Sequence, residues 1–141
     1  MQTKFSAPIA AAVVILVAIS LAGCGTENLC ANPEVLNTVK KLYAQRTLGQ
    51  FIEAPEGAFT AQDRSATPVS VDNQSKIAKC SVLIRADALV LAKMVQRSTD
   101  EELAQMKENA AKRGVPTFED FLVNYQVQPL ASGQNYVTLL R

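Results

Sequence analysis

An apolar segment near the amino terminus limits how much of this 141-residue chain is left to fold. The segment runs from about Ile9 to Ala22, follows a single basic residue, Lys4, and leads through Gly23 to Cys24. A helix that spans a bilayer needs about 20 apolar residues, whereas this run has about 14. Its charged start, apolar middle and small-residue end are typical of a cleavable export signal. Removal of residues 1–23 leaves 118 residues, which suits a single domain.

The run Leu21-Ala22-Gly23-Cys24 resembles the lipobox of bacterial lipoproteins. The resemblance implies transfer of diacylglycerol to the Cys24 thiol, cleavage before Cys24 and acylation of the new amino terminus. Several acyl chains would hold the protein stably, because each buried methylene contributes about 0.8 kcal/mol. Gly25 replaces the Asp that favours inner-membrane retention in enterobacterial lipoproteins, so we expect an outer-membrane anchor facing the periplasm. The alternatives are an ordinary signal peptide or an uncleaved anchor, followed by a chance cysteine.

Two cysteines, Cys30 and Cys80, remain once Cys24 is assigned to lipid. Disulfides persist in the oxidising compartment to which the export signal leads, so we predict that these two cysteines pair. The bond would close a loop of about 50 residues and contribute roughly 4 kcal/mol in the chain-entropy model. Redox sites usually carry Cys-x-x-Cys instead. Two thiols without histidine do not complete a usual zinc site, so we expect neither a metal nor another cofactor.

The chain contains no histidine. Ser-His-Asp and Cys-His catalysis are therefore excluded, as are metal sites that use histidine. Paired carboxylates could still cleave a glycoside, and the acidic groups available are Glu119-Asp120 and Asp100-Glu101-Glu102. We interpret both groups as helix-start or loop charges, so the sequence does not indicate an enzyme.

The charge of the mature chain is balanced. Without Lys4 it carries 13 basic and 13 acidic residues, and the basic ones are scattered singly or in pairs. Proteins that bind nucleic acid usually show a basic face or stripe. We therefore expect no nucleic-acid partner.

A helix is predicted from the start signal at Asn32 to about Arg46. Asn32 is a suitable cap, Pro33 fits the first helical position, and Glu34 faces the positive end of the helix dipole. Gly49 follows as an expected stop. Apolar side chains recur at helical spacing in this segment, at Val35, Leu36, Val39, Leu42 and Tyr43. Residues 24–29 are predicted to form a short tether, which places the single domain at 30–141.

The remaining pattern indicates strands and turns. Residues 50–72 show weak periodicity and are interrupted by Pro and Gly, so we predict mostly loop, with a short edge strand over 67–71. Residues 79–85 alternate, with Cys80, Val82 and Ile84 on one face. Residues 121–127 and 135–140 also alternate across a Gly-containing turn, which predicts a terminal hairpin. A helical turn over 117–120 is a competing local interpretation.

Two helices are predicted between these strands. Residues 88–96 are apolar and rich in good helix formers. Residues 100–113 follow overlapping capping boxes, Ser98 with Glu101 and Thr99 with Glu102, and end before Gly114. The apolar residues of this second helix are few: Leu103, Met106 and Ala110. This predicts a surface helix with one narrow buried seam, although a helix that binds a partner would have a similar pattern.

The mature chain resembles small exported bacterial α+β proteins in the pattern Cys30-x-x-Pro33-x-Val35, Cys80-x-Val82-x-Ile84, Tyr125-x-Val127 and Tyr136-Val137-x-Leu139. The resemblance implies an N-terminal helix packed on a small antiparallel sheet and a helix-to-strand disulfide, without a particular activity. The predicted fold class is therefore α+β. A helical insert before the C-terminal hairpin departs from that pattern and is the expected place for a feature specific to this protein.

These observations favour a lipid-anchored binding or assembly module in the cell envelope. Contact with an envelope protein is expected through a sheet edge or through the insert at residues 86–113, as in an accessory protein of a secretion or conjugation apparatus. The alternative is a periplasmic enzyme or enzyme inhibitor.

Overall fold

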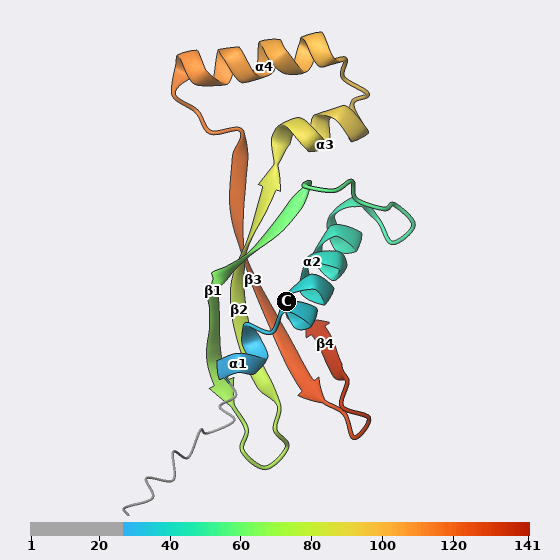
Figure 1. The fold of residues 1–141 in the computed structure, drawn as a ribbon, viewed down its shortest axis with the longest axis vertical. Coiled ribbons are helices and arrows are strands. Elements are labelled where there is room, and N and C mark those ends of the chain that lie inside the picture. The colour runs from blue at the N-terminus through green and yellow to red at the C-terminus, as the bar shows by residue number, and fades with distance from the viewer. Residues whose placement is uncertain (1–26) are drawn as a thin grey trace, which may run out of the picture.

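The protein forms a four-stranded antiparallel sheet with one long helix packed across it (Figure 1). The computed structural model describes residues 27–141, and side chains from residue 29 onward. Cys24 and the signal peptide predicted for residues 1–23 lie outside the described residues. Along the chain, the elements are α1 Glu27–Cys30, α2 Pro33–Leu48, β1 Phe59–Val71, β2 Ala78–Asp87, α3 Ala88–Val95, α4 Asp100–Arg113, β3 Phe118–Pro129 and β4 Asn135–Leu139. The predicted α+β class is confirmed.

Helix α2 begins and ends at the residues that the sequence indicates. The Asn32 side chain accepts hydrogen bonds from the backbone N–H groups of Glu34, at 2.9 Å, and Val35. Pro33 occupies the first helical position, where its missing N–H has no intrahelical partner to lose. Gly49 follows the last turn with φ of 107°, a conformation that favours glycine. The predicted helix is confirmed and extends two residues beyond Arg46, to Leu48.

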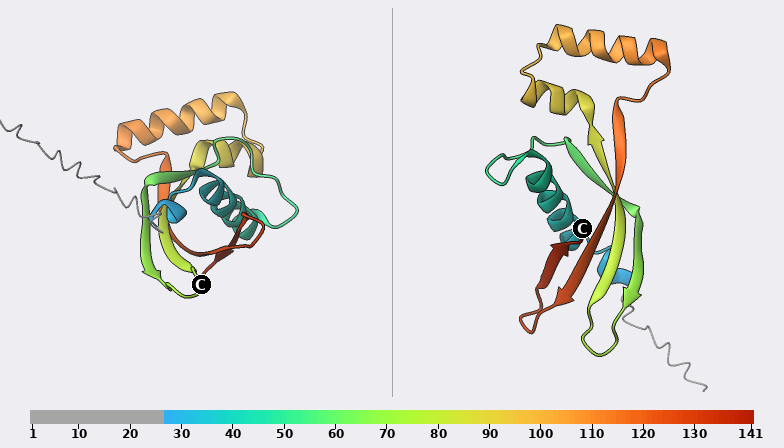
Figure 2. Two further views of the ribbon diagram at one scale, coloured as in Figure 1. Left: turned by 60° about the horizontal axis from the view of Figure 1, so that its bottom comes forward. Right: turned by 180° about the vertical axis from the view of Figure 1, so that it is seen from behind.

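The core lies between α2 and the concave face of the sheet, which curves around the helix in the left view of Figure 2. Every second residue of β2 is buried: Ala78, Cys80, Val82, Ile84 and Ala86. The neighbouring β3 buries Val123, Tyr125 and Val127, and α2 contributes Val35, Leu36, Val39 and Ala44. The alternation predicted for residues 79–85 and 121–127 is therefore confirmed.

Strand β1 is longer than predicted. It spans 13 residues, whereas the sequence suggested mostly loop with a strand over 67–71. Between the pairs Gln62–Leu83 and Thr67–Ser81, four residues of β1 oppose the single residue Val82, and a second register shift follows Pro68. These bulges interrupt the alternation of buried and exposed side chains, so the strand has no clear period of two in its sequence.

At the larger bulge, the Ser65 hydroxyl replaces a backbone partner in the hydrogen bonding between β1 and β2. It accepts a hydrogen bond from the backbone N–H of Leu83 at 2.8 Å and donates one to the carbonyl of Gln62 at 2.6 Å. The Leu83 N–H thus keeps a partner where the ladder between β1 and β2 is broken. Pairing of the two strands resumes at Thr67 and Ser81.

The helical insert consists of α3 and α4, between β2 and β3, and the terminal hairpin consists of β3 and β4. Both predicted insert helices and the predicted hairpin are confirmed, while residues 118–120 are strand rather than a helical turn. Residues 27–30 form the short helix α1, so ordered structure begins within the segment predicted as a tether. None of the helices within residues 27–141 is both long and apolar enough to cross a membrane.

Candidate interaction surface

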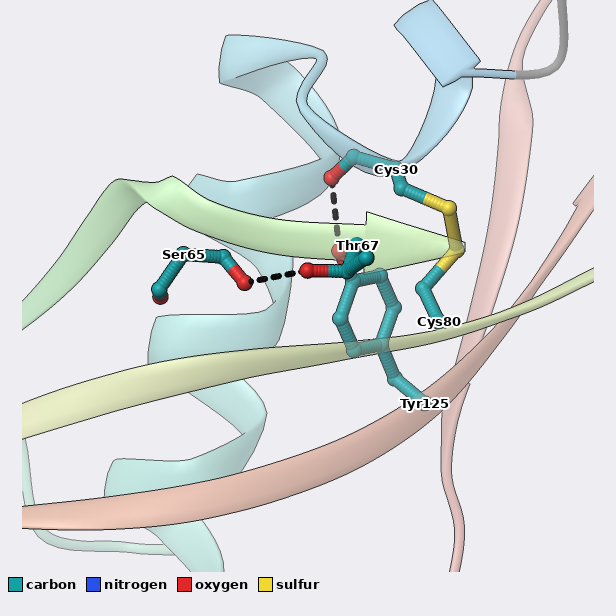
Figure 3. The surroundings of a disulfide bond; sticks show 5 residues. All are labelled: Cys30, Ser65, Thr67, Cys80 and Tyr125. Carbon is teal, nitrogen blue, oxygen red and sulfur yellow. Dashed lines mark hydrogen bonds between the residues drawn. A yellow bond between two sulfur atoms is a disulfide. The ribbon is translucent and has the colours of Figure 1, made fainter. Parts of the chain in front are cut away.

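A disulfide joins Cys30, the last residue of α1, to Cys80 on the buried face of β2 (Figure 3). The two Cα atoms are 5.7 Å apart. The pairing that the sequence predicts is confirmed, and it links a helix to a strand. Because Cys80 pairs directly with Tyr125 of β3, the bond fixes α1 over the centre of the sheet.

A hydrogen bond from Tyr125 joins β3 to the same residue, Cys30. The Tyr125 hydroxyl, buried beneath α1, donates to the carbonyl oxygen of Cys30 at 2.6 Å (Figure 3). Burial raises the pKa of Tyr125 to about 12. The sequence placed Tyr125 on the core side of a strand, but its spacing did not indicate that the hydroxyl contacts a residue 95 positions away.

Replacing this hydroxyl is expected to change how stability depends on pH. Tyr125→Phe should lower the free energy of unfolding by about 1–3 kcal/mol at neutral pH, because the buried Cys30 carbonyl loses its donor. In the unsubstituted protein, folding raises the pKa of Tyr125 from 10.0 to about 12. The contribution of the hydroxyl to the free energy of unfolding is therefore complete below pH 10 and is lost as the pH rises toward 12. Urea denaturation of both proteins across this range should show a steeper alkaline loss in the native protein. Parallel pH profiles would contradict the assignment.

Of the insert predicted for residues 86–113, residues 88–113 form a hairpin of two helices at one end of the molecule (Figure 1), and Ala86 and Asp87 are the last residues of β2. The Asp87 side chain caps α3 by accepting from the N–H groups of Leu89 and Val90. Thr99 and Glu102 form the reciprocal capping box that starts α4, one of the two predicted, and Gly114 ends α4 with φ of 65°. Strong local signals therefore define both helices.

Helix α4 contributes nothing fully buried to the fold. It packs against α3, and an ion pair from Lys93 to Asp100, at 2.7 Å, joins the two helices. The buried seam predicted for α4 is wrong in degree: Leu103 and Ala110 are half-buried, and Met106 is exposed. Further exposed apolar side chains, Val95 and Val115, lie at the ends of the two helices. The hairpin thus presents apolar side chains to solvent.

In each of the two acidic groups considered as catalytic candidates, one aspartate forms an ion pair. Asp120 accepts two hydrogen bonds from Arg85, at 2.8 and 2.9 Å, and these lower the pKa of its carboxyl group. The hydrogen bond from Lys93 likewise lowers the pKa of Asp100. A general acid at neutral pH needs a raised pKa, so neither carboxyl group is adapted to that role.

A groove of about 540 Å³ lies between α2 and the loop at residues 49–57. Lys40 and Lys41 line it from α2, Glu53 and Glu56 line it from the loop, and Phe51 of the loop is 93% exposed. The sequence pattern alone did not indicate this site; the signal that could have done so is the apolar pair Phe51-Ile52 in an otherwise polar loop. Within residues 29–141 no charged side chain is buried, the hydroxyl of Tyr125 is the polar group already described in the core, and no group of three potential metal ligands occurs.

No protein-family model, curated protein or solved structure matches the chain.

Proposed function

We propose that this chain is a lipid-anchored binding module that docks an envelope protein through its α3–α4 hairpin. Diacylglycerol on Cys24 would hold it in the outer membrane, facing the periplasm. The observation that carries the proposal is α4, a fully capped helix of 14 residues without a buried side chain.

Packing of an amphipathic face supplies most of the stability of helices in proteins. In α4 that contribution is small, because the half-buried Leu103 and Ala110 are its most protected apolar residues and Met106 is exposed. Caps, the dipole-matched acidic first turn and the Glu108–Lys112 ion pair support the helix locally. A partner that covers Met106 and the ends of the hairpin would supply the missing burial.

The position of the hairpin supports the same function. Cys30, six residues after Cys24, is bonded to Cys80, and β2 runs from there to Asp87. Seven residues of strand span about 23 Å. Figure 1 shows α1 beside the lower half of the sheet and the hairpin beyond its other end. A protein anchored at Cys24 would therefore hold its hairpin away from the lipid surface.

A binding role rather than an enzymatic one is supported by the lowered pKa values of Asp100 and Asp120. The hairpin also carries charges of both signs, acidic at the start of α4 and basic at its end. Such a surface fits a protein partner with a mixed surface better than a polyanion. An accessory role in a secretion or conjugation apparatus is one setting for such a module.

Cys24→Ser is expected to move the protein from the membrane fraction to the soluble periplasmic fraction, because the lipid acceptor is lost. Cell fractionation with detection of the protein measures this shift. Mass spectrometry of the native amino terminus provides the matching control, since it should find acyl chains on Cys24. Unchanged membrane association of the variant would contradict the anchor.

Docking is tested by a photo-crosslinking residue placed at Gln105 or Asn109, both exposed on α4. In intact cells at native expression, these positions should form one or a few defined adducts with envelope proteins. The control position is Asn73, in the turn between β1 and β2, which should form none of them. Absence of adducts from α4, or the same adducts from Asn73, would contradict docking through the hairpin.

A further inference from the structure

The two edges of the sheet are built differently. The β1 edge carries two register shifts, the charged residues Asp63 and Arg64, and Pro68. Natural sheets use these devices to prevent pairing with another chain. The β4 edge, Asn135–Leu139, contains no charge, no proline and no register shift, and its Tyr, Val and Thr residues favour strands. One edge is protected from pairing and the other is open to it.

The backbone groups on the open edge can be assigned from the register. Leu130 donates its N–H to the carbonyl of Gln134, and Leu140 donates to Asn124. Hydrogen-bonded pairs recur every second residue in an antiparallel ladder. The backbone N–H and C=O groups of Tyr136 and Thr138 therefore also point toward β3. The N–H and C=O groups of the alternate residues, Asn135, Val137 and Leu139, therefore point away from the sheet.

A groove of about 340 Å³ lies beside the first three residues of β4, Asn135–Val137, and the turn that precedes them. The first two turns of α2 form one wall through Glu34, Val35 and Thr38, and the other wall includes Tyr136 and Val137. Side chains of consecutive strand residues leave opposite faces of a sheet. A groove that contacts both Tyr136 and Val137 must therefore open at the edge of β4, where the unpaired backbone groups lie.

We infer that β4 takes up an extended segment of a partner protein as a fifth strand, in the groove beside α2. The unpaired N–H and C=O groups would supply the hydrogen bonds, as in other strand additions. An apolar side chain of the segment would contact Tyr136, which lines the groove and is 59% exposed. A lysine or arginine beside it would face Glu34, which has no ion pair within residues 29–141.

A second copy of this chain fits the edge less well, because its own β4 strand, Asn135–Leu139, carries no lysine or arginine that could face Glu34. The inference uses β4 and α2 alone, and it therefore stands or falls independently of the lipid anchor and of docking through the hairpin.

The test uses the full chain in detergent micelles and a short synthetic peptide of alternating valine and threonine with one lysine. In an NMR titration, the amide signals of Asn135, Val137 and Leu139 should shift and saturate, while those of β1 should not. The same peptide, N-methylated at alternate residues to remove the donors that face β4, should lose binding. Its side chains are otherwise unchanged.

A charge variant tests the chemistry of the groove. Glu34→Gln should weaken binding of the lysine peptide roughly two- to fivefold, as expected for an exposed ion pair, whereas Glu56→Gln in the distant loop should not. Equal binding of the methylated peptide, or shifts confined to β1, would overturn the inference. Concentration-dependent dimerisation that shifts the β4 amides without peptide would overturn it in favour of a second copy.

Discussion

Replacing both bonded cysteines, Cys30→Ala with Cys80→Ala, is expected to lower the free energy of unfolding by about 4 kcal/mol. The disulfide closes a loop with a sequence separation of 50, and removing it restores the conformational freedom of that loop in the unfolded state. Small domains are commonly stable by only about 5–15 kcal/mol. Urea denaturation of the oxidised protein and the double variant, fitted to two states, measures the difference.

The contribution of Tyr125 is separable from that of the disulfide. The double substitution keeps the backbone carbonyl of residue 30, which accepts the hydrogen bond from the Tyr125 hydroxyl. Chemical reduction of the native protein should therefore produce a loss similar to that of the double variant. A difference below about 1 kcal/mol between oxidised and reduced protein would contradict the role of the loop constraint.

Val82→Asp is expected to abolish folding. Val82 is 0% exposed and lies at the centre of the buried face of β2, opposite Val123. A carboxylate at this position would lose its hydration without gaining a cationic partner, at a cost of several kcal/mol beyond the lost apolar burial. Circular dichroism during heating should show no cooperative transition for the variant.

The matched control is Leu122→Asp, on the opposite face of the same sheet. Leu122 is 66% exposed, so the new carboxylate remains hydrated. This variant should unfold cooperatively, with its free energy of unfolding within about 1 kcal/mol of the native value. A normal melting curve for Val82→Asp, or an equal loss in both variants, would contradict the assignment of the buried face.

Sequence pattern was sufficient where one residue determines local geometry or where alternation is strict. Asn32, Pro33 and Gly49 define the limits of α2, and Thr99 with Glu102 begins α4 as a capping box. The period of two around Val82 identified the buried face of β2. If Cys24 carries lipid, as the sequence predicts, Cys30 and Cys80 have only each other as partners.

Features that depend on distant contacts could not be predicted in this way. The Ser65 hydroxyl completes a broken ladder on β2, which a local pattern does not record. The groove beside β4 exists because α2 packs next to a strand about 100 residues later in the chain. The half-buried state of Leu103 depends on how far α3 covers α4. Helical periodicity alone specifies only that Leu103, Met106 and Ala110 lie on the same face of α4.

The disulfide also determines how the protein would respond to tension. A pull on the chain before Cys30, resisted at the α3–α4 hairpin, passes through the sulfur atoms into Cys80 and along β2 to Asp87. Residues 31–79, which include α2 and β1, form the longer covalent connection between the same two cysteines, so the disulfide prevents tension from extending that segment. The shortest mechanical route through the molecule is therefore a single strand at the centre of the sheet, braced by hydrogen bonds on both sides.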